Sequence, residues 1–244
     1  MIAEVNTSPR QRIIHALHPA RLQPYLDAAL GNEKNALSLY VWHIELTAAV
    51  HSILGVTEVI VRNAMDAALQ TWNNEQTGRT ESWLLVDPES PLKSLSAGKR
   101  KSALTRTVQD FAARDPQHAR HGVAICHDDV LAHIMFGLWK DLLPNHQPGA
   151  GNALENVNRK RLWDESLRVA FKIDDPDGSV TFWRIAHLHQ LRNRVSHMEP
   201  LLNLQIKDLI NDAFALIRSI DESAADWATG ISKVSAVLNQ RPTF

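Results

Sequence analysis

The sequence predicts an all-α fold, and two observations support this prediction. Apolar residues recur at three-to-four spacing along most of the chain, which places them on one face of a helix. No segment alternates apolar and polar residues over the length of a strand, so a sheet is not expected. The 244 residues are enough to bury a sizeable core. We expect a helical extension over residues 1–32 and a helical domain over residues 33–244.

Capping residues and prolines set the expected helix boundaries in the first half of the chain. Ser8-Pro9 is typical of a helix start, because serine caps the first turn and proline is tolerated at its first position. A second short helix is expected to end near Gly31. A long helical pattern then runs from Glu33 to about Gln76, and Gly55 marks an expected bend within it.

The rest of the chain is also expected to be helical, interrupted by polar or proline-containing segments. A loop is expected over 77–95, a helix over 96–113 and an irregular histidine-rich segment over 117–127. The apolar periodicity then predicts helices over 130–143, 154–172, 181–198, 204–220 and 223–238. Asp128 or Asp129 is suited to cap the first of these five, and Pro144 closes it.

Composition indicates a soluble protein of the cytoplasm. The single cysteine, Cys126, excludes an intrachain disulfide and fits a reducing compartment. The first 24 residues lack the apolar core of a signal peptide, and no apolar run approaches the roughly 18 residues of a membrane span. We therefore expect a cytoplasmic location and no membrane contact.

The overall charge does not indicate a nucleic-acid partner, whereas its local distribution allows one. The net charge is −1, while nucleic-acid-binding domains are often strongly basic. Residues 90–109 nevertheless carry basic side chains and no acidic one, and a second basic cluster follows at 159–161. Either cluster can contact a phosphate backbone, and a solvated helix face explains each cluster as well.

One expected helix carries the residues best suited to phosphate chemistry. Arg192, Asn193 and His197 lie close together in the helix expected over 181–198. Arginine holds phosphate through a fixed fork of donors, and histidine gains and loses a proton near neutrality. Asn193 and His197 share a helix face, whereas Arg192 reaches His197 only through its long side chain.

These residues suit metal-free cleavage of RNA, in which a ribose 2′-hydroxyl attacks its own phosphate. His197 would remove that proton or donate one to the leaving 5′-oxygen. Arg192 would neutralise the charge that develops on the phosphate, and Asn193 would orient the phosphate or the imidazole. One histidine cannot be acid and base in the same step, so a symmetric homodimer that pairs two such helices is favoured. The mechanism requires no metal and no cofactor.

Three blocks of the sequence, in the order 40–64, 135–139 and 191–200, resemble one protein family. Residues 191–200 read LRNRVSHMEP and resemble a segment of Abi-like proteins, the abortive-infection group of HEPN (higher eukaryotes and prokaryotes nucleotide-binding) domains. Upstream, YVWHIEL at 40–46 and EVIVRNA at 58–64 are similar to the Y-x-W-x-x-x-L and L-E-x-x-L-R-N helices of that group. MFGLW at 135–139 is similar to its F-G-x-W helix, so the resemblance covers roughly residues 36–215.

The resemblance implies a HEPN-type helical bundle with additional helices, dimerisation around a composite cleft, and metal-independent endoribonuclease activity. It also implies a role as a toxin or anti-phage abortive-infection effector, with RNA as substrate and an antitoxin or phage-derived trigger as a further partner. Arg192 and His197 take the catalytic positions, with Asn193 beside the arginine. The residues expected to bind RNA or support the cleft are Glu58, Arg62, Asn63, Arg194 and Glu199.

Simpler interpretations of the same residues stay open. Glu58, Arg62 and Asn63 either line the cleft or form an ionic network that holds helices together. The site can also bind RNA or a nucleotide without cleaving it. Alternatively, the helices can form a scaffold that only binds another protein. A histidine-rich group suggests a metal site, but its spacing matches no familiar zinc pattern and a polar loop explains it better. This group consists of His118, His121, Cys126, His127, Asp128 and Asp129.

Overall fold

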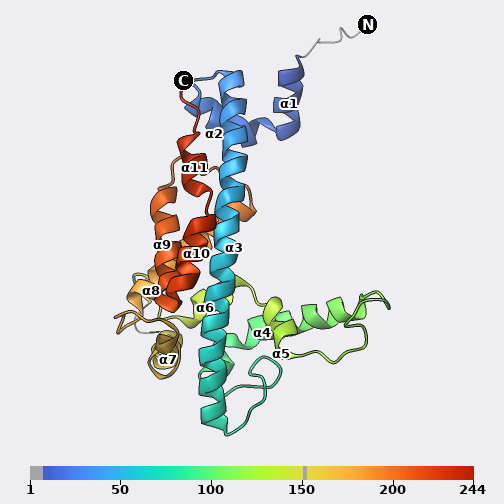
Figure 1. Ribbon diagram of the computed structural model, residues 1–244, viewed down its shortest axis with the longest axis vertical. Coiled ribbons are helices and arrows are strands. Elements are labelled where there is room, and N and C mark those ends of the chain that lie inside the picture. Colours follow the sequence, from blue (N-terminus) through green and yellow to red (C-terminus); the bar gives the residue numbers. More distant parts are fainter. Residues whose placement is uncertain (1–7, 151–152) are drawn as a thin grey trace.

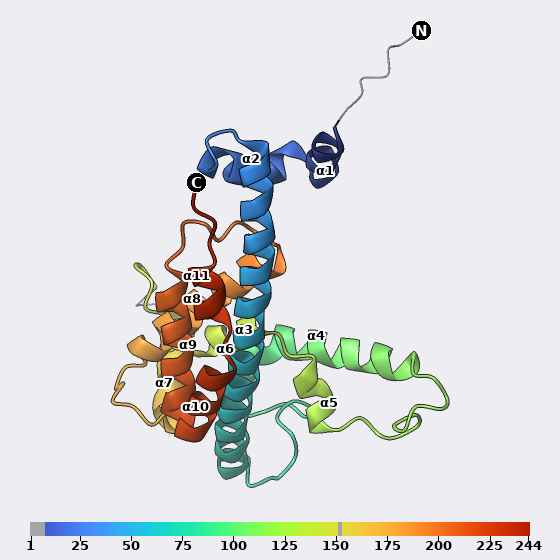
Figure 2. The same cartoon turned by 45° about the horizontal axis from the view of Figure 1, so that its top comes forward.

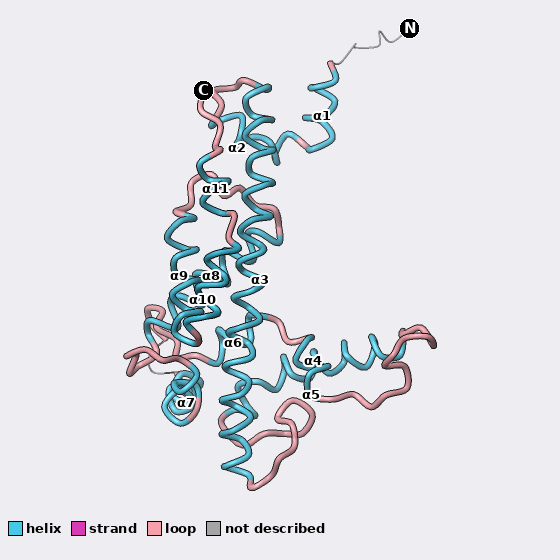
Figure 3. The backbone as a smooth tube through the Cα atoms, viewed as in Figure 1, coloured by secondary structure: helices cyan, strands magenta, loops and turns pink. Residues whose placement is uncertain are grey.

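The computed structural model describes residues 8–150 and 153–244, and this part of the chain contains helices and no strand (Figures 1 and 3). The expected all-α class is therefore confirmed. Residues 1–7, which begin the expected N-terminal extension, lie outside the described residues.

A single long helix, α3 (Glu33–Thr77), forms the axis of the molecule (Figure 1). The Asn32 side chain accepts from the N–H of Asn35 at its start, and Gly78, with φ of 66°, ends it in the left-handed conformation. The bend expected at Gly55 is wrong, because the helix runs through this exposed position without interruption. Buried side chains on both sides of Gly55, including Ile53, Leu54 and Thr57, hold this part of the helix against its neighbours.

By length and composition, α3 qualifies as a helix that could cross a membrane, although the core helix of a soluble protein passes the same test. The sequence-based expectation of no membrane contact considered only uninterrupted apolar runs and therefore overlooked this helix. In the folded chain, α3 packs against α2 (Pro19–Ala28), α8 (Ser179–Ser196), α9 (Ile206–Ile220) and α11 (Val234–Asn239).

The C-terminal helices form a bundle along one side of α3. Helices α8, α9, α10 (Glu222–Ile231) and α11 lie beside it in both ribbon views (Figures 1 and 2). The single helix expected over 223–238 is wrong. The chain leaves helical geometry at Ser232, with ψ of 126°, and α11 then packs on α3 rather than continuing α10.

The N-terminal helices lie at one end of α3. Helix α1 (Pro9–Leu17) begins with the capping expected at Ser8-Pro9, since the Ser8 side chain accepts from the N–H of Gln11. It buries no residue. Helix α2, in contrast, packs on α3 and contributes Leu22 and Tyr25 to the main hydrophobic core.

The middle of the chain forms an arm that projects from the other side of α3 (Figure 2). Helix α4 (Leu92–Ala112) begins four residues before its expected start, and α5 (His127–Ala132) packs on it. The single helix expected over 130–143 is wrong, because Met135 has extended geometry and separates α5 from α6 (Phe136–Leu142). This break turns the chain so that α6 packs against both α4 and α8.

One further expected helix is shorter than the sequence suggested. The helix expected over 154–172 is α7 (Leu154–Glu165), which ends at Glu165, and a 3₁₀ turn, η1 (Leu167–Ala170), follows it. Ser166 causes the interruption, since its hydroxyl donates to the carbonyl of Ala68 in α3, 3.1 Å away. The chain is therefore drawn toward α3, and η1 packs against that helix.

Candidate functional site

Helices α4, α6 and α8 enclose a pocket of about 270 Å³ that is lined by cations and histidines. No carboxylate belongs to its lining, so the side chains around it favour an anion. The polar and charged side chains of the lining are Lys99, Ser102, Arg106, His133, His189, Arg192 and Asn193.

Two helix faces position these side chains. On α8, His189, Arg192 and Asn193 are spaced three and four residues apart and therefore project from one face. On α4, Lys99, Ser102 and Arg106 repeat the same pattern over two turns. The pocket therefore lies between a polar face of α4 and a polar face of α8, and α6 packs against both helices.

The start of α8 is held in place by two features. Asp175 accepts from the backbone N–H groups of Val180 and Thr181, at 3.1 and 2.8 Å, and so caps the helix from a position before its first turn. Gly178 precedes the helix with φ of 75°, and a Cβ at this position would lie 3.0 Å from the Trp163 ring. The helix that carries the predicted catalytic residues therefore starts from a rigid base.

Arg192 lies at the pocket and also touches the central helix. Its Nε is 3.8 Å from Oε2 of Glu58 in α3, which is a weak ion pair between partly exposed groups. Glu58 therefore does lie beside the predicted catalytic arginine. Arg62 and Asn63, which were expected to accompany Glu58, do not line the pocket. They contact each other instead, since Nε of Arg62 donates to Oδ1 of Asn63, 3.3 Å away.

His197 does not share the pocket with Arg192. It ends α8 as the C-cap residue, is exposed, and is not among the lining residues. Its backbone N–H donates to the carbonyl of Asn193 at 3.0 Å, and its own carbonyl accepts from Nη1 of Arg21 at 3.3 Å. Within one chain, Arg192 and Asn193 therefore lie together at the pocket, and the exposed His197 side chain lies outside it, at the end of the helix.

Arg194 and Glu199, which were also expected to bind RNA or support the cleft, lie away from the pocket. Arg194 and Glu199 form an exposed ion pair, with Nη1 and Oε2 separated by 3.8 Å. Arg194 also lines a different hollow, which α2 forms with residues 200–204. The structure thus places Arg194 beside α2, and Glu199 is paired with it outside the pocket.

The turn after α8 is anchored to two other helices. Met198 adopts φ of 52°, and its carbonyl accepts from Nη1 of Arg21 in α2 at 2.6 Å. His43 in α3 is fully buried, and its Nε2 donates to the carbonyl of Glu199 at 3.1 Å. Burial is the main reason that the pKa of His43 is lowered. These contacts fix the position of the adjacent His197 backbone.

His189 is a pocket residue that the sequence analysis missed. Burial is the main cause of its lowered pKa, and the neighbouring Lys140 lowers it further. Its three-residue spacing from Arg192 was the signal that could have identified it, because such spacing places both side chains on one helix face. The lowered pKa favours the neutral form of the imidazole, which lines the same pocket as the Arg192 guanidinium.

The basic residues of 90–109 divide between the pocket and the core. Lys99 and Arg106 line the pocket. Arg100 is instead buried, and its guanidinium donates to the carbonyls of Trp83 and Val86 at 2.9 and 2.6 Å. The second cluster is also engaged internally, since Arg159 and Arg161 pair with Glu155 and Glu165 on their own helix.

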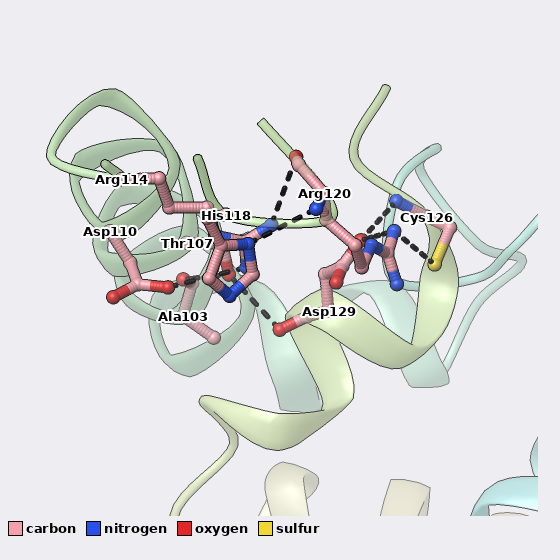
Figure 4. Close-up of polar contacts among 8 residues, drawn as sticks. All are labelled: Ala103, Thr107, Asp110, Arg114, His118, Arg120, Cys126 and Asp129. Atoms are coloured by element: carbon pink, nitrogen blue, oxygen red, sulfur yellow. Dashed lines mark hydrogen bonds and ion pairs between the residues drawn. The ribbon is translucent and has the colours of Figure 1, made fainter. Parts of the chain in front are cut away.

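The histidine-rich group is divided between the loop before α5 and the first turn of α5, and it does not converge on one point. Asp129 accepts from the backbone N–H of Cys126 at 2.8 Å and from Nη2 of Arg120 at 2.7 Å. Figure 4 shows Arg120 reaching toward both of these residues. In the described ranges, no group of three or more histidine, cysteine, aspartate or glutamate side chains is placed to hold a metal ion.

His127 belongs to a Ser-His-Asp network that the sequence did not reveal. Its Nε2 lies 2.9 Å from Oδ2 of Asp66, and its Nδ1 lies 2.7 Å from Oγ of Ser82. Asp66 also accepts from Nε1 of the buried Trp83 at 2.8 Å. The Ser82 hydroxyl accepts two backbone N–H groups of its own turn, at 3.1 and 3.3 Å. This network therefore ties the segment before α4 and the start of α5 to α3.

Comparison of the chain with protein-family models, with curated proteins and with solved structures found no match.

Proposed function

We propose that this protein is a metal-independent endoribonuclease of the cytoplasm that acts as a toxin or anti-phage effector. The observation that supports the proposal is the pocket at which Arg192 and Asn193 meet Lys99 and Arg106, with no carboxylate in the lining. The three cations of the lining, Lys99, Arg106 and Arg192, outnumber the two carboxylates that pair with them from outside it. The excess of positive charge suits the phosphate of an RNA strand.

In the proposed reaction, Arg192 and Lys99 hold the scissile phosphate and stabilise the additional charge of its five-coordinate state. Asn193 orients the phosphate through its amide. His197 is exposed at the end of α8, so it is accessible to RNA bound by a second copy of the chain. We propose that a symmetric homodimer brings His197 of the partner subunit to the pocket, where it donates a proton to the leaving 5′-oxygen.

The proposal is tested with purified protein, end-labelled RNA and excess EDTA. We expect cleavage products that end in a 2′,3′-cyclic phosphate. The variants His197→Ala and Arg192→Ala should each lose on the order of a hundredfold or more in rate. Arg184→Ala is the matched control: Arg184 lies on the same helix and faces Asp212, 3.7 Å away, outside the pocket. A requirement for a divalent metal, or full activity of His197→Ala, contradicts the mechanism.

A second candidate is a module that binds RNA or a nucleotide without cutting it. The position of His197 outside the pocket favours this alternative, because a single chain then offers phosphate-binding groups without the predicted catalytic histidine. This alternative would be supported if the protein binds RNA tightly and the RNA stays intact on a gel at protein concentrations that permit dimerisation. An Arg192→Ala variant should then weaken binding alone.

A further inference from the structure

His189 lines the pocket together with Lys99 and Arg192. We propose that His189 is a catalytic residue that accepts the proton of the attacking ribose 2′-hydroxyl, while Arg192 and Lys99 hold the phosphate. The assignment rests on the proposed function, because it adds a second histidine to the same RNA-cleaving site. It removes the difficulty that one histidine cannot act as acid and base in a single step.

The placement of His189 supports this role. His189 and Arg192 are three residues apart on α8, project from the same face and line the same pocket. In the described part of the chain, neither ring nitrogen of His189 hydrogen-bonds to a protein atom, so a substrate hydroxyl has an open acceptor. This differs from His127, whose two nitrogens are both occupied.

Gly137 keeps the space beside the imidazole open. A Cβ at position 137 would lie 3.3 Å from Nε2 of His189 and 3.8 Å from Nζ of Lys99. The carbonyl of Gly137 also accepts from Nζ of Lys99 at 2.9 Å, which fixes the lysine at the pocket. A residue without a side chain at the start of α6 thus leaves room for both the imidazole and the ammonium group.

The charged groups around His189 favour its neutral form. Lys99 faces it from α4, Lys140 and Asp141 from α6, and Arg192 from its own helix. Arg106 and His133 also line the pocket. Burial and the cations lower the pKa of the imidazole, and Asp141, which pairs with Lys99 and Lys140, opposes them. A neutral imidazole is the form that a general base requires.

The reaction then balances without a further reactant. The 2′-hydroxyl proton passes to His189 as the 2′-oxygen bonds to phosphorus, and the bond from phosphorus to the 5′-oxygen breaks. His197 of the partner subunit gives its proton to the 5′-oxygen. The products are a 2′,3′-cyclic phosphate and a 5′-hydroxyl, and proton exchange with solvent restores both histidines.

The test compares His189→Asn with His187→Asn. The control residue lies on another face of α8, near Asp212 and outside the pocket. For His189→Asn we expect a loss of roughly a hundredfold or more in single-turnover cleavage. Its affinity for an uncleavable oligonucleotide with a 2′-deoxy residue at the scission site should stay within a few-fold of wild type. His187→Asn should cleave normally, and thermal unfolding checks that both variants are folded.

The pH profile provides a readout that a structural role would not change. Wild-type cleavage should fall on the acid side as His189 becomes protonated, and the remaining activity of His189→Asn should lack this fall. His189→Gln serves as a second variant if the asparagine variant does not fold.

Two results would overturn the assignment, and they are distinguishable. Cleavage by His189→Asn within threefold of wild type, with the same acid limb, overturns the role of His189 and leaves the proposed function intact. Wild-type protein that leaves RNA uncut in EDTA overturns the proposed function and this role together.

Discussion

His127 and His189 are both partly buried imidazoles, but their surroundings have opposite charge. His127 is hydrogen-bonded to Asp66, which raises its pKa, and its other nitrogen contacts Ser82. His189 lies among cations in a pocket, and its pKa is lowered. The comparison teaches that a histidine with both nitrogens occupied serves to join segments, whereas one with free nitrogens beside cations is suited to react with an anionic substrate.

The largest effect on stability is expected from removing Asp66, the hydrogen-bond partner of His127. Asp66→Ala leaves the Nε1–H of buried Trp83 and one nitrogen of His127 without an acceptor. We expect a loss of about 2–3 kcal/mol in the free energy of unfolding. Urea denaturation measures it, and Asp66→Asn, which keeps one carbonyl oxygen, should lose less. Equal stability of Asp66→Ala and wild type would show that the network does not hold the loop.

A smaller effect is expected on RNA affinity at the pocket. Arg106→Gln removes a cation that lines the pocket. We expect binding to weaken by roughly tenfold at low salt, and the slope of log affinity against log salt to decrease by about one. Fluorescence titration at several salt concentrations measures both. Arg218→Gln, on α9 and paired with Asp226, is the control and should leave the slope unchanged.

The two histidines should also differ in how they make stability depend on pH. His127 has a raised pKa in the folded state, so its stabilisation is fully present below about pH 6.5 and is lost as the pH rises through the raised value. His189 and buried His43 have lowered pKa values, so their contribution is present above about pH 6.5 and is lost as the pH falls.

Denaturation of wild type and His127→Gln at pH 5.5 and pH 8.5 tests this difference. The wild-type advantage should be larger at the acidic pH. An advantage that grows toward alkaline pH would contradict the assigned ion pair with Asp66.

The smallest effect is expected from Gly137→Ala, which separates helix stability from pocket geometry. Alanine is favoured over glycine in a helix by up to about 1 kcal/mol, so stability should stay equal or rise slightly. The new Cβ presses on the His189 imidazole, 3.3 Å away, so RNA cleavage should fall by a few-fold. Thermal unfolding and cleavage assays measure the two effects. A variant that is destabilised and fully active would contradict this view of the pocket.

Part of the candidate site could be predicted from the sequence. Arg192 and Asn193 were expected to lie together on one helix, and α8 places both at the pocket because helical spacing is a local property. Lys99 and Arg106 were recognised only as members of a basic segment. Their meeting with α8 depends on how α6 packs between the two helices, which no spacing within one helix reveals.

The sequence by itself determined that the chain is helical, where α1 begins, where α3 and α9 approximately begin and end, and which residues share a face of each helix. Those properties depend on capping groups and on a repeat of 3.6 residues, which are local. Only the tertiary structure decided that the chain turns at Met135, Ser166 and Ser232. It also decided that His189 rather than His197 accompanies Arg192 at the pocket, because packing between distant helices selects which faces meet.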